Sequence, residues 1–265
     1  MPADPGTAPT AKWSDLSTRI TSAVVMILVG AGEILLGGIW FQMLVVFVVA
    51  VIVWEVARMI HPRSEVSSML LAALAASVLS GVLGAENDWQ MFLLLVVPLI
   101  GAASFPRSGW HFAAFALYVQ IGGWALVQFR NDHGLGFVLW LLAVVIATDI
   151  LGYFAGRIFG GPKFWPRVSP KKTWSGTGAG WIGAALVGWG FVAPLGLGWG
   201  LVPISIAVSL ASQMGDIAES ALKRRYGAKD SSSLIPGHGG VFDRFDALLG
   251  ACVFVIALRL VGWPG

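Results

Sequence analysis

The sequence predicts an all-α, polytopic integral membrane protein: a helix bundle with about nine transmembrane helices and a cytoplasmic N-terminus. Hydrophobic residues make up 57% of the 265 residues and charged residues only 12%. Soluble domains carry about 25% charged residues, so this chain could not cover a water-exposed surface. Apolar runs of about 20 residues, the length that crosses a bilayer, recur along the chain, and the basic residues cluster in alternate loops.

The chain divides into three parts. Residues 1–18 are rich in Pro, Ala and Thr, which is typical of a disordered tail. Residues 19–133 contain five expected spans, and residues 134–265 form a C-terminal catalytic region with two polar cytoplasmic segments. The nine spans are expected at 20–37, 39–60, 66–84, 89–105, 110–129, 134–156, 178–198, 201–222 and 247–262.

Loop charge supports this count and orientation. With a cytoplasmic N-terminus, 15 of the 17 basic residues fall in cytoplasmic segments, and only Arg130 and Arg259 fall on the other side. The net charge of +3 therefore reflects cytoplasmic loops, and no nucleic-acid partner is expected. Two cytoplasmic segments, 157–177 and 223–246, are long and polar, so the functional site is expected where they meet.

Five acidic residues lie at membrane depth, where ionisable groups are costly and ask for a reason. Glu33 and Glu55 have a plain explanation as hydrogen-bond partners between helices or as groups near the interface. Asp149, Asp216 and Glu219 lie close to the two polar segments and are the stronger functional candidates.

One helix face carries several chemical groups. Asp216, Glu219, Ser220 and Lys223 follow one another at spacings that place them on the same side of a helix. Two carboxylates, a hydroxyl and an amine on one face are typical of a catalytic surface. The alternative is a simple salt bridge from either acid to the lysine.

The following segment, from Lys229 to Asp246, is rich in turn residues. Pro236 and three glycines predict a loop whose backbone can approach a ligand closely. His238 lies between glycines, which favours a role in binding a ligand or fixing the loop. Asp243 and Asp246 share a face if the last helix begins there, although Asp243 could instead cap that helix.

The segment that follows Asp149 carries the cations. Gly152 and Gly156 favour tight helix packing. Lys171 and Lys172 stand beside serine, threonine and glycine and can bind phosphate oxygens, either of a substrate or simply of lipid. Carboxylates for a hard divalent cation beside cations for phosphates are what phosphoryl or nucleotidyl transfer requires. The chain lacks the P-loop, zincin and α/β-hydrolase motifs.

These residues resemble the signature of the phosphatidate cytidylyltransferases, the CDP-diacylglycerol synthases. The pattern runs through Ser220, Leu222, Lys223, Arg224, Lys229, Asp230, Pro236, His238, Gly239, Gly240, Asp243, Arg244 and Asp246. The stretch from Ser169 to Thr173 and the residues around Asp149 and Asp216 are also similar to the family. The resemblance covers the chain from about residue 149. One departure is Ser175, where the family often has glutamate.

The resemblance implies a reaction in which CTP and phosphatidic acid give CDP-diacylglycerol and pyrophosphate. It implies Mg²⁺ as cofactor, with room for a second, monovalent cation. Membrane lipid and a second copy of the chain, in a homodimer, are the other expected partners. The expected location is a bacterial inner membrane, with the active site facing the cytoplasm.

Roles follow for individual residues as hypotheses. The expected metal ligands are Asp216 and Asp243, then Asp246, with Asp149 and Glu219 as alternates. The expected catalytic residues are Asp216, Asp243, Asp246, Lys223 and Ser220. Substrate binding is expected from Lys171, Lys172, Arg224, Lys229, His238, Gly239, Gly240, Arg244 and Ser169. Two other readings stay open: a CTP-dependent polyprenol or lipid kinase, and a cation-coupled transporter.

Overall fold

The computed structural model describes residues 8–105 and 107–263 and is almost entirely helical. Its elements are α1 (Ala8–Leu36), α2 (Gly38–Ile60), α3 (Glu65–Leu83), the 3-10 helix η1 (Asp88–Leu95), α4 (Val96–Ser104), α5 (Gly109–Ile158), β1 (Lys163–Trp165), β2 (Ser169–Thr173), α6 (Trp174–Leu195), α7 (Leu201–Arg225) and α8 (Phe242–Leu260). The predicted helical class is confirmed, except that β1 and β2 form a small antiparallel hairpin in the first polar segment. Residues 1–7 of the expected tail lie outside the described residues, and α1 begins within the rest of it.

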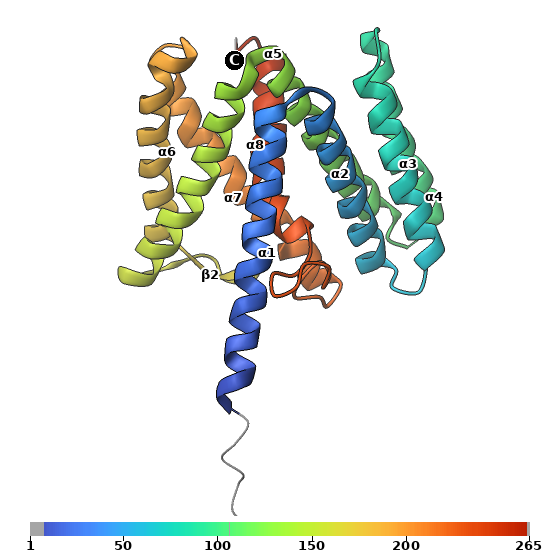
Figure 1. The fold of residues 1–265 in the computed structure, drawn as a ribbon, viewed down its shortest axis with the longest axis horizontal. Coiled ribbons are helices and arrows are strands. Elements are labelled where there is room, and N and C mark those ends of the chain that lie inside the picture. The colour runs from blue at the N-terminus through green and yellow to red at the C-terminus, as the bar shows by residue number, and fades with distance from the viewer. Residues whose placement is uncertain (1–7, 106, 264–265) are drawn as a thin grey trace, which may run out of the picture.

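Within the described ranges, six helices are long and apolar enough to cross a membrane: α1, α2, α3, α5, α6 and α7. Helix α5 has 50 residues, which at 1.5 Å per residue is about 75 Å, more than twice the thickness of a hydrocarbon core. Its helical geometry is interrupted at Gly134, where φ is 79°. Figure 1 shows α5 rising to the upper end of the molecule and turning back down. This turn separates the two stretches expected at 110–129 and 134–156.

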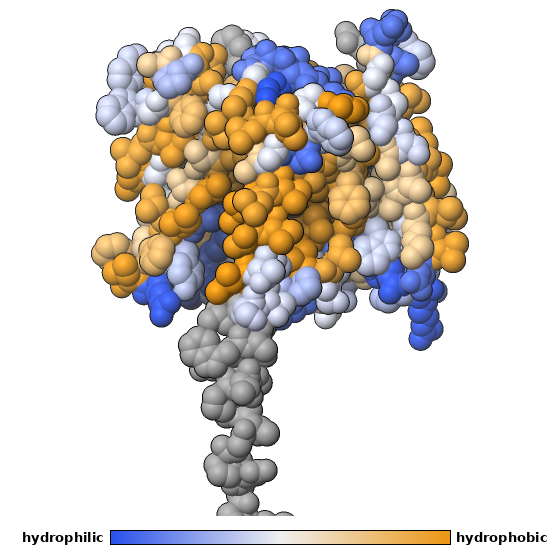
Figure 2. Space-filling view, in the orientation of Figure 1, coloured by the Kyte–Doolittle hydropathy of each residue, from blue (hydrophilic) through white to orange (hydrophobic). Residues whose placement is uncertain are grey.

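The surface matches a membrane environment. Large apolar side chains are exposed along α1, α2, α3 and α6. Figure 2 shows them as a broad hydrophobic band across the middle of one face, with hydrophilic side chains above and below it. Apolar surface of this extent is unfavourable in water and favourable in lipid, so the coarse prediction of an integral membrane protein agrees with the fold.

A proline explains why the fourth expected span does not begin as a regular α-helix. Pro98 has no N–H and cannot donate to the carbonyl of Leu94, four residues earlier. The chain before it runs as the 3-10 helix η1, and the Leu94 carbonyl instead accepts a hydrogen bond from Gln120 Nε2 of α5 at 3.0 Å. A buried polar contact between helices thus compensates for the missing backbone bond.

One end of the bundle gathers the polar segments. The rings of His61, after α2, and Phe105, after α4, stack with centroids 5.5 Å apart. The hydroxyl of Tyr226, after α7, lies 3.1 Å from His111 Nδ1 near the start of α5. Figure 1 shows the hairpin and the 226–241 loop at this same lower end. We call it the polar end, and among the described residues it holds 61–64, 105, 107–108, 159–173 and 226–241.

The opposite end carries short turns and the two remaining basic residues. Gly37 joins α1 to α2 with φ of 65°, and a Cβ there would lie 2.6 Å from the guanidinium of Arg130. Arg130 Nε donates to the carbonyl of Ile34 at 3.2 Å, which satisfies a carbonyl at the end of α1. Arg259 forms an ion pair with Asp132 at 3.1 Å.

Candidate active site

Three carboxylates from α7 and α8 meet at the polar end. One oxygen each of Asp216, Glu219 and Asp246 lies within 4.8 Å of the others. Asp216 and Glu219 share a face of α7, as their spacing predicts, and Asp246 comes from the beginning of α8. Glu219 and Asp246 are buried. Three of the predicted metal ligands therefore lie together, and we call them the carboxylate cluster.

Two glycines allow α7 and α8 to approach at the level of this cluster. A Cβ on Gly215 would lie 2.3 Å from the carbonyl oxygen of Asp246. A Cβ on Gly250 would lie 2.5 Å from the carbonyl oxygen of Ala211. Neither distance is compatible with a side chain, so the close approach requires glycine at both positions. The carboxylates meet because these two helices touch.

Lys223 lies at the edge of the cluster between two acids. Its Nζ is 2.5 Å from Glu219 Oε2 and 2.5 Å from Asp243 Oδ1. The salt bridge weighed as an alternative is thus present, with a second carboxylate added. Glu219 Oε1 is buried and has no hydrogen-bond partner in the part of the chain that the structure describes. Such an oxygen is costly to leave alone, and a bound cation would satisfy it.

Asp243 ties together both ends of the segment between α7 and α8. Its Oδ2 accepts hydrogen bonds from Ser231 N at 2.9 Å, Ser231 Oγ at 2.9 Å and Gly240 N at 2.8 Å. Burial alone would raise the pKa of Asp243, but the hydrogen bonds from Lys223, Gly240 and Ser231 hold that pKa below its ordinary value. Asp243 is therefore ionised. Three donors already occupy its Oδ2, so only Oδ1, which pairs with Lys223 here, is left to bind a metal.

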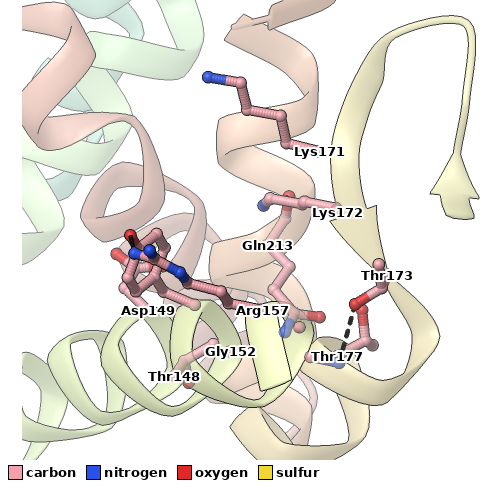
Figure 3. Close-up of a pocket in the computed structure, with 12 residues that line it drawn as sticks. Thr148, Asp149, Gly152, Arg157, Lys171, Lys172, Thr173, Thr177 and Gln213 are labelled. Atoms are coloured by element: carbon pink, nitrogen blue, oxygen red, sulfur yellow. Dashed lines mark hydrogen bonds between the residues drawn. The ribbon is translucent and has the colours of Figure 1, made fainter. Parts of the chain in front are cut away.

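A pocket of about 300 Å³ opens between α5, β2, α6 and α7 (Figure 3). Its charged lining consists of Asp149, Arg157, Lys171 and Lys172. Lys172 Nζ lies 2.6 Å from Asp216 Oδ2, so the pocket adjoins the carboxylate cluster. The first polar segment meets α7 here, and the pocket lining would offer a phosphate the cationic side chains of Arg157, Lys171 and Lys172.

Helix α6 begins directly after the hairpin and holds it against α5. The Thr173 hydroxyl caps α6 by accepting from Gly176 N at 3.2 Å. A Cβ on Gly176 would lie 2.5 Å from the carbonyl oxygen of Gly152, which confirms the tight packing predicted for this stretch of α5. Ser175 donates to the carbonyl of Gly160 at 2.5 Å, so this position fastens the loop before the hairpin.

The remaining predicted residues occupy the periphery of the site. Ser220 Oγ donates to Asp216 Oδ1 at 3.3 Å. His238 Nδ1 lies 2.9 Å from Ser22 Oγ, so it fixes the loop to α1. Arg244 donates to the carbonyl of His238 at 2.8 Å. The others lie as follows: Gly239 and Gly240 next to Asp243, Ser169 half-buried in β2, and Lys171, Arg224 and Lys229 exposed.

Two further residues belong to the site. Gln213 lines the pocket, and its Oε1 is buried without a hydrogen-bond partner among the described residues. Its position three residues before Asp216, on the same helix face, could have identified it. Glu55, from α2, binds the segment that carries Asp243. A glutamate in an apolar helix is visible in the sequence, but its hydrogen-bond partners could not be identified because they are distant in sequence.

The donor set fits a divalent cation. Hard cations such as Mg²⁺ prefer carboxylate oxygens and retain several waters. The carboxylate cluster offers three such oxygens, one from each of its residues. Glu219 Oε1 has no hydrogen-bond partner among the described residues. No histidine or cysteine belongs to this group of described residues, which disfavours a softer metal. Asp149 lies farther along the pocket wall.

Comparison with known proteins gives a consistent result. The model of the cytidylyltransferase family matches residues 17–261. Phosphatidate cytidylyltransferase of Brucella abortus biovar 1 (strain 9-941) is 35% identical over 257 residues, which is 91% of this chain and 92% of the relative. The Bacillus subtilis (strain 168) protein of that name is 29% identical and aligns with 92% of this chain and 97% of its own length.

Proposed function

Because the chain belongs to the cytidylyltransferase family, we propose that it transfers the cytidylyl group of CTP to phosphatidic acid. The products are CDP-diacylglycerol and pyrophosphate. The observation that carries the proposal is the contact between a carboxylate cluster and a lysine-lined pocket. A nucleotidyl transfer needs a divalent cation next to phosphates whose negative charges are compensated. Its relatives named phosphatidate cytidylyltransferase supply the substrate class.

The chemistry balances as one displacement. A phosphate oxygen of phosphatidic acid forms a bond to the α-phosphorus of CTP, the bond from that phosphorus to the β-phosphate oxygen breaks, and pyrophosphate leaves. Both substrates are anionic, so their approach is unfavourable unless cations surround them. Lys172, Lys171 and Arg157 line the pocket and would hold the triphosphate. Lys223, which pairs with Glu219 and Asp243 here, would compensate charge on the lipid phosphate.

The carboxylate cluster would hold the magnesium ion. Asp216 and Asp246 supply oxygens from two helices, and Glu219 supplies a further carboxylate whose Oε1 is buried without a hydrogen-bond partner among the described residues. Asp243 can contribute Oδ1 if Lys223 turns towards a phosphate, since its Oδ2 is occupied by three donors. A bound Mg²⁺ supplies charge compensation at phosphate oxygens and orients the group that is transferred. The serine and lysine side chains around it orient the carboxylates.

We further propose nine crossings with the polar end in the cytoplasm of a bacterial inner membrane. Counting α5 twice, on either side of Gly134, and adding Trp89–Ser104 and α8 to the apolar helices gives this number. Figure 1 places the segments rich in lysine and arginine at one end, as the positive-inside rule demands. Figure 2 shows hydrophilic side chains recessed beside α1 in the lower half of the apolar band. That recess offers a lipid headgroup a lateral route to the site.

The test uses CTP labelled at different phosphates. The purified protein is incubated with phosphatidic acid, Mg²⁺ and CTP carrying ³²P in either the α- or the γ-position. Label from the α-position in the lipid product supports cytidylyl transfer. Label from the γ-position in the lipid would instead establish a CTP-dependent lipid kinase. The absence of any labelled lipid from an intact, folded sample would reopen the transporter reading.

A further inference from the structure

Glu55 is an isolated carboxylate inside the N-terminal half of the bundle. It lies in α2, near the polar end, and its side chain is completely buried. Among the residues that the structure describes, no lysine or arginine forms an ion pair with it. A buried carboxylate without a cation is retained only if hydrogen bonds compensate for its lost hydration.

Four donors provide that compensation: three come from the segment between α7 and α8, and the fourth is the N–H of Phe242, the first residue of α8. Oε1 accepts from Val241 N at 2.8 Å and from Ser232 Oγ at 2.6 Å. Oε2 accepts from Phe242 N at 2.7 Å and from Ser231 Oγ at 3.1 Å. Each carboxylate oxygen therefore receives one backbone N–H and lies within hydrogen-bond distance of one serine hydroxyl.

The two backbone donors belong to the start of α8. The first N–H groups of a helix have no partner within the helix, and its N-terminus carries partial positive charge. Val241 precedes α8 and offers no side-chain cap of its own. The carboxylate of Glu55 therefore caps α8 from a helix far away in sequence. The contact sets both the position and the first turn of α8.

The same segment is joined directly to the carboxylate cluster. Ser231 Oγ lies 3.1 Å from Glu55 Oε2 and 2.9 Å from Asp243 Oδ2. One hydroxyl hydrogen serves both acids, so Ser231 links them. Gly240 leaves room for this arrangement, because a Cβ there would lie 1.9 Å from Ser231 Oγ and 2.5 Å from Glu55 Oε1.

We propose that Glu55 is a positioning residue for the transfer reaction. By holding the first turn of α8, it places Asp246 against α7 and completes the carboxylate cluster. The inference rests on the metal site proposed above. It also gives the N-terminal half of the bundle a specific task, since α2 contributes no residue to the cluster itself.

The test compares Glu55→Gln with Glu55→Asp, and with Glu33→Gln as a matched control in α1. Glutamine keeps the size of the side chain but replaces one carboxylate oxygen by an NH₂ group. That group would face the N–H and hydroxyl donors that now bind the carboxylate. We expect Glu55→Gln to lower kcat by about tenfold to a hundredfold, the loss predicted for one or two charge-assisted hydrogen bonds. The Mg²⁺ concentration for half-maximal rate should rise several-fold, Glu55→Asp should recover part of both, and Glu33→Gln should match wild type.

A second readout does not depend on activity. Trypsin should cleave the Glu55→Gln protein faster after Lys229, in the released segment, and at an unchanged rate after Arg63, in the loop after α2. Should Glu55→Gln not fold, Ser232→Ala removes one donor, leaves the carboxylate in place and should show the same effects more weakly. Unchanged Mg²⁺ dependence and unchanged cleavage after Lys229 in folded variants would overturn the proposal. Failure of wild type to transfer cytidylyl groups would refute the proposed function but not the trypsin result.

Discussion

Lys172 Nζ contacts Asp216 Oδ2 at 2.6 Å, and this ion pair joins the first polar segment of the chain to helix α7. Lys172 belongs to the hairpin before α6, and Asp216 to the face of α7 that carries the cluster. The lysine also points its Nζ towards the carbonyl of Gln213 at 3.4 Å. A phosphate in the adjoining pocket could recruit this ammonium group, which would free the Asp216 oxygen for a metal.

Replacing Lys172 should mainly weaken nucleotide binding. Lys172→Met keeps the length of the side chain but removes its charge, and losing one charge-assisted bond to phosphate predicts a rise of about tenfold or more in KM for CTP. Steady-state kinetics with varied CTP would measure it. Lys163→Met, on the neighbouring strand β1, is the control and should leave KM for CTP unchanged. Equal effects of the two variants would show that only general surface charge matters.

Asp216→Asn should abolish turnover without preventing folding. The change removes the charge that a divalent cation requires, and we expect a loss of about a hundredfold or more in kcat. Asp132→Asn, at the opposite end of the bundle, removes an acid that pairs with Arg259 and should leave kcat intact. Pyrophosphate release by both purified variants provides the measurement. A near-normal rate for Asp216→Asn would remove this residue from the proposed metal site.

The glycine contact between α7 and α8 should be sensitive to a single methyl group. Gly250→Ala places a Cβ 2.5 Å from the carbonyl oxygen of Ala211, and such overpacking costs about 1–3 kcal/mol. Gly190→Ala in α6 is the control, since no described atom lies within 4 Å of its Cβ. That variant should be stabilised by about 0.4–1 kcal/mol. Thermal unfolding in detergent should show opposite shifts in Tm, and equal shifts would contradict the account.

Asp243 should stabilise the protein over the whole neutral range of pH. Its pKa in the folded protein is lower than in the unfolded chain, where an aspartate has a pKa of about 3.9. Its contribution is therefore complete above the unfolded value and is lost as the pH falls through the folded one. The Tm difference between wild type and Asp243→Asn should stay constant from about pH 8 to about pH 5 and shrink only below about pH 4. A difference that instead grows as the pH falls below about 7 would mean that the pKa is raised.

The sequence predicted the site well where the chemistry is local. The three-residue and four-residue spacings from Asp216 to Lys223 fix which side chains share a face of α7, and that face is observed. The packing at Gly152 also follows from local glycine chemistry. These features depend on neighbours within a few residues, so a single sequence contains enough information.

Features set by distant contacts could not be predicted in this way. The partners of Glu55 are more than a hundred positions away, so its polar character was visible but its task was not. The hairpin of β1 and β2 is too short for a periodic pattern, and Pro170 disguises its second strand. The hydrogen bond from Gln120 that satisfies the Leu94 carbonyl beside the 3-10 helix comes from another helix. Tertiary contacts decide each of these.

The most direct test of the central claim is pyrophosphate release by the detergent-purified protein. The assay contains CTP, Mg²⁺ and phosphatidic acid, and each is omitted in turn. Release that requires all three components, together with a CDP-lipid product, is the result that the account predicts. Release without phosphatidic acid, or lipid phosphorylation with CDP as the product, would contradict it.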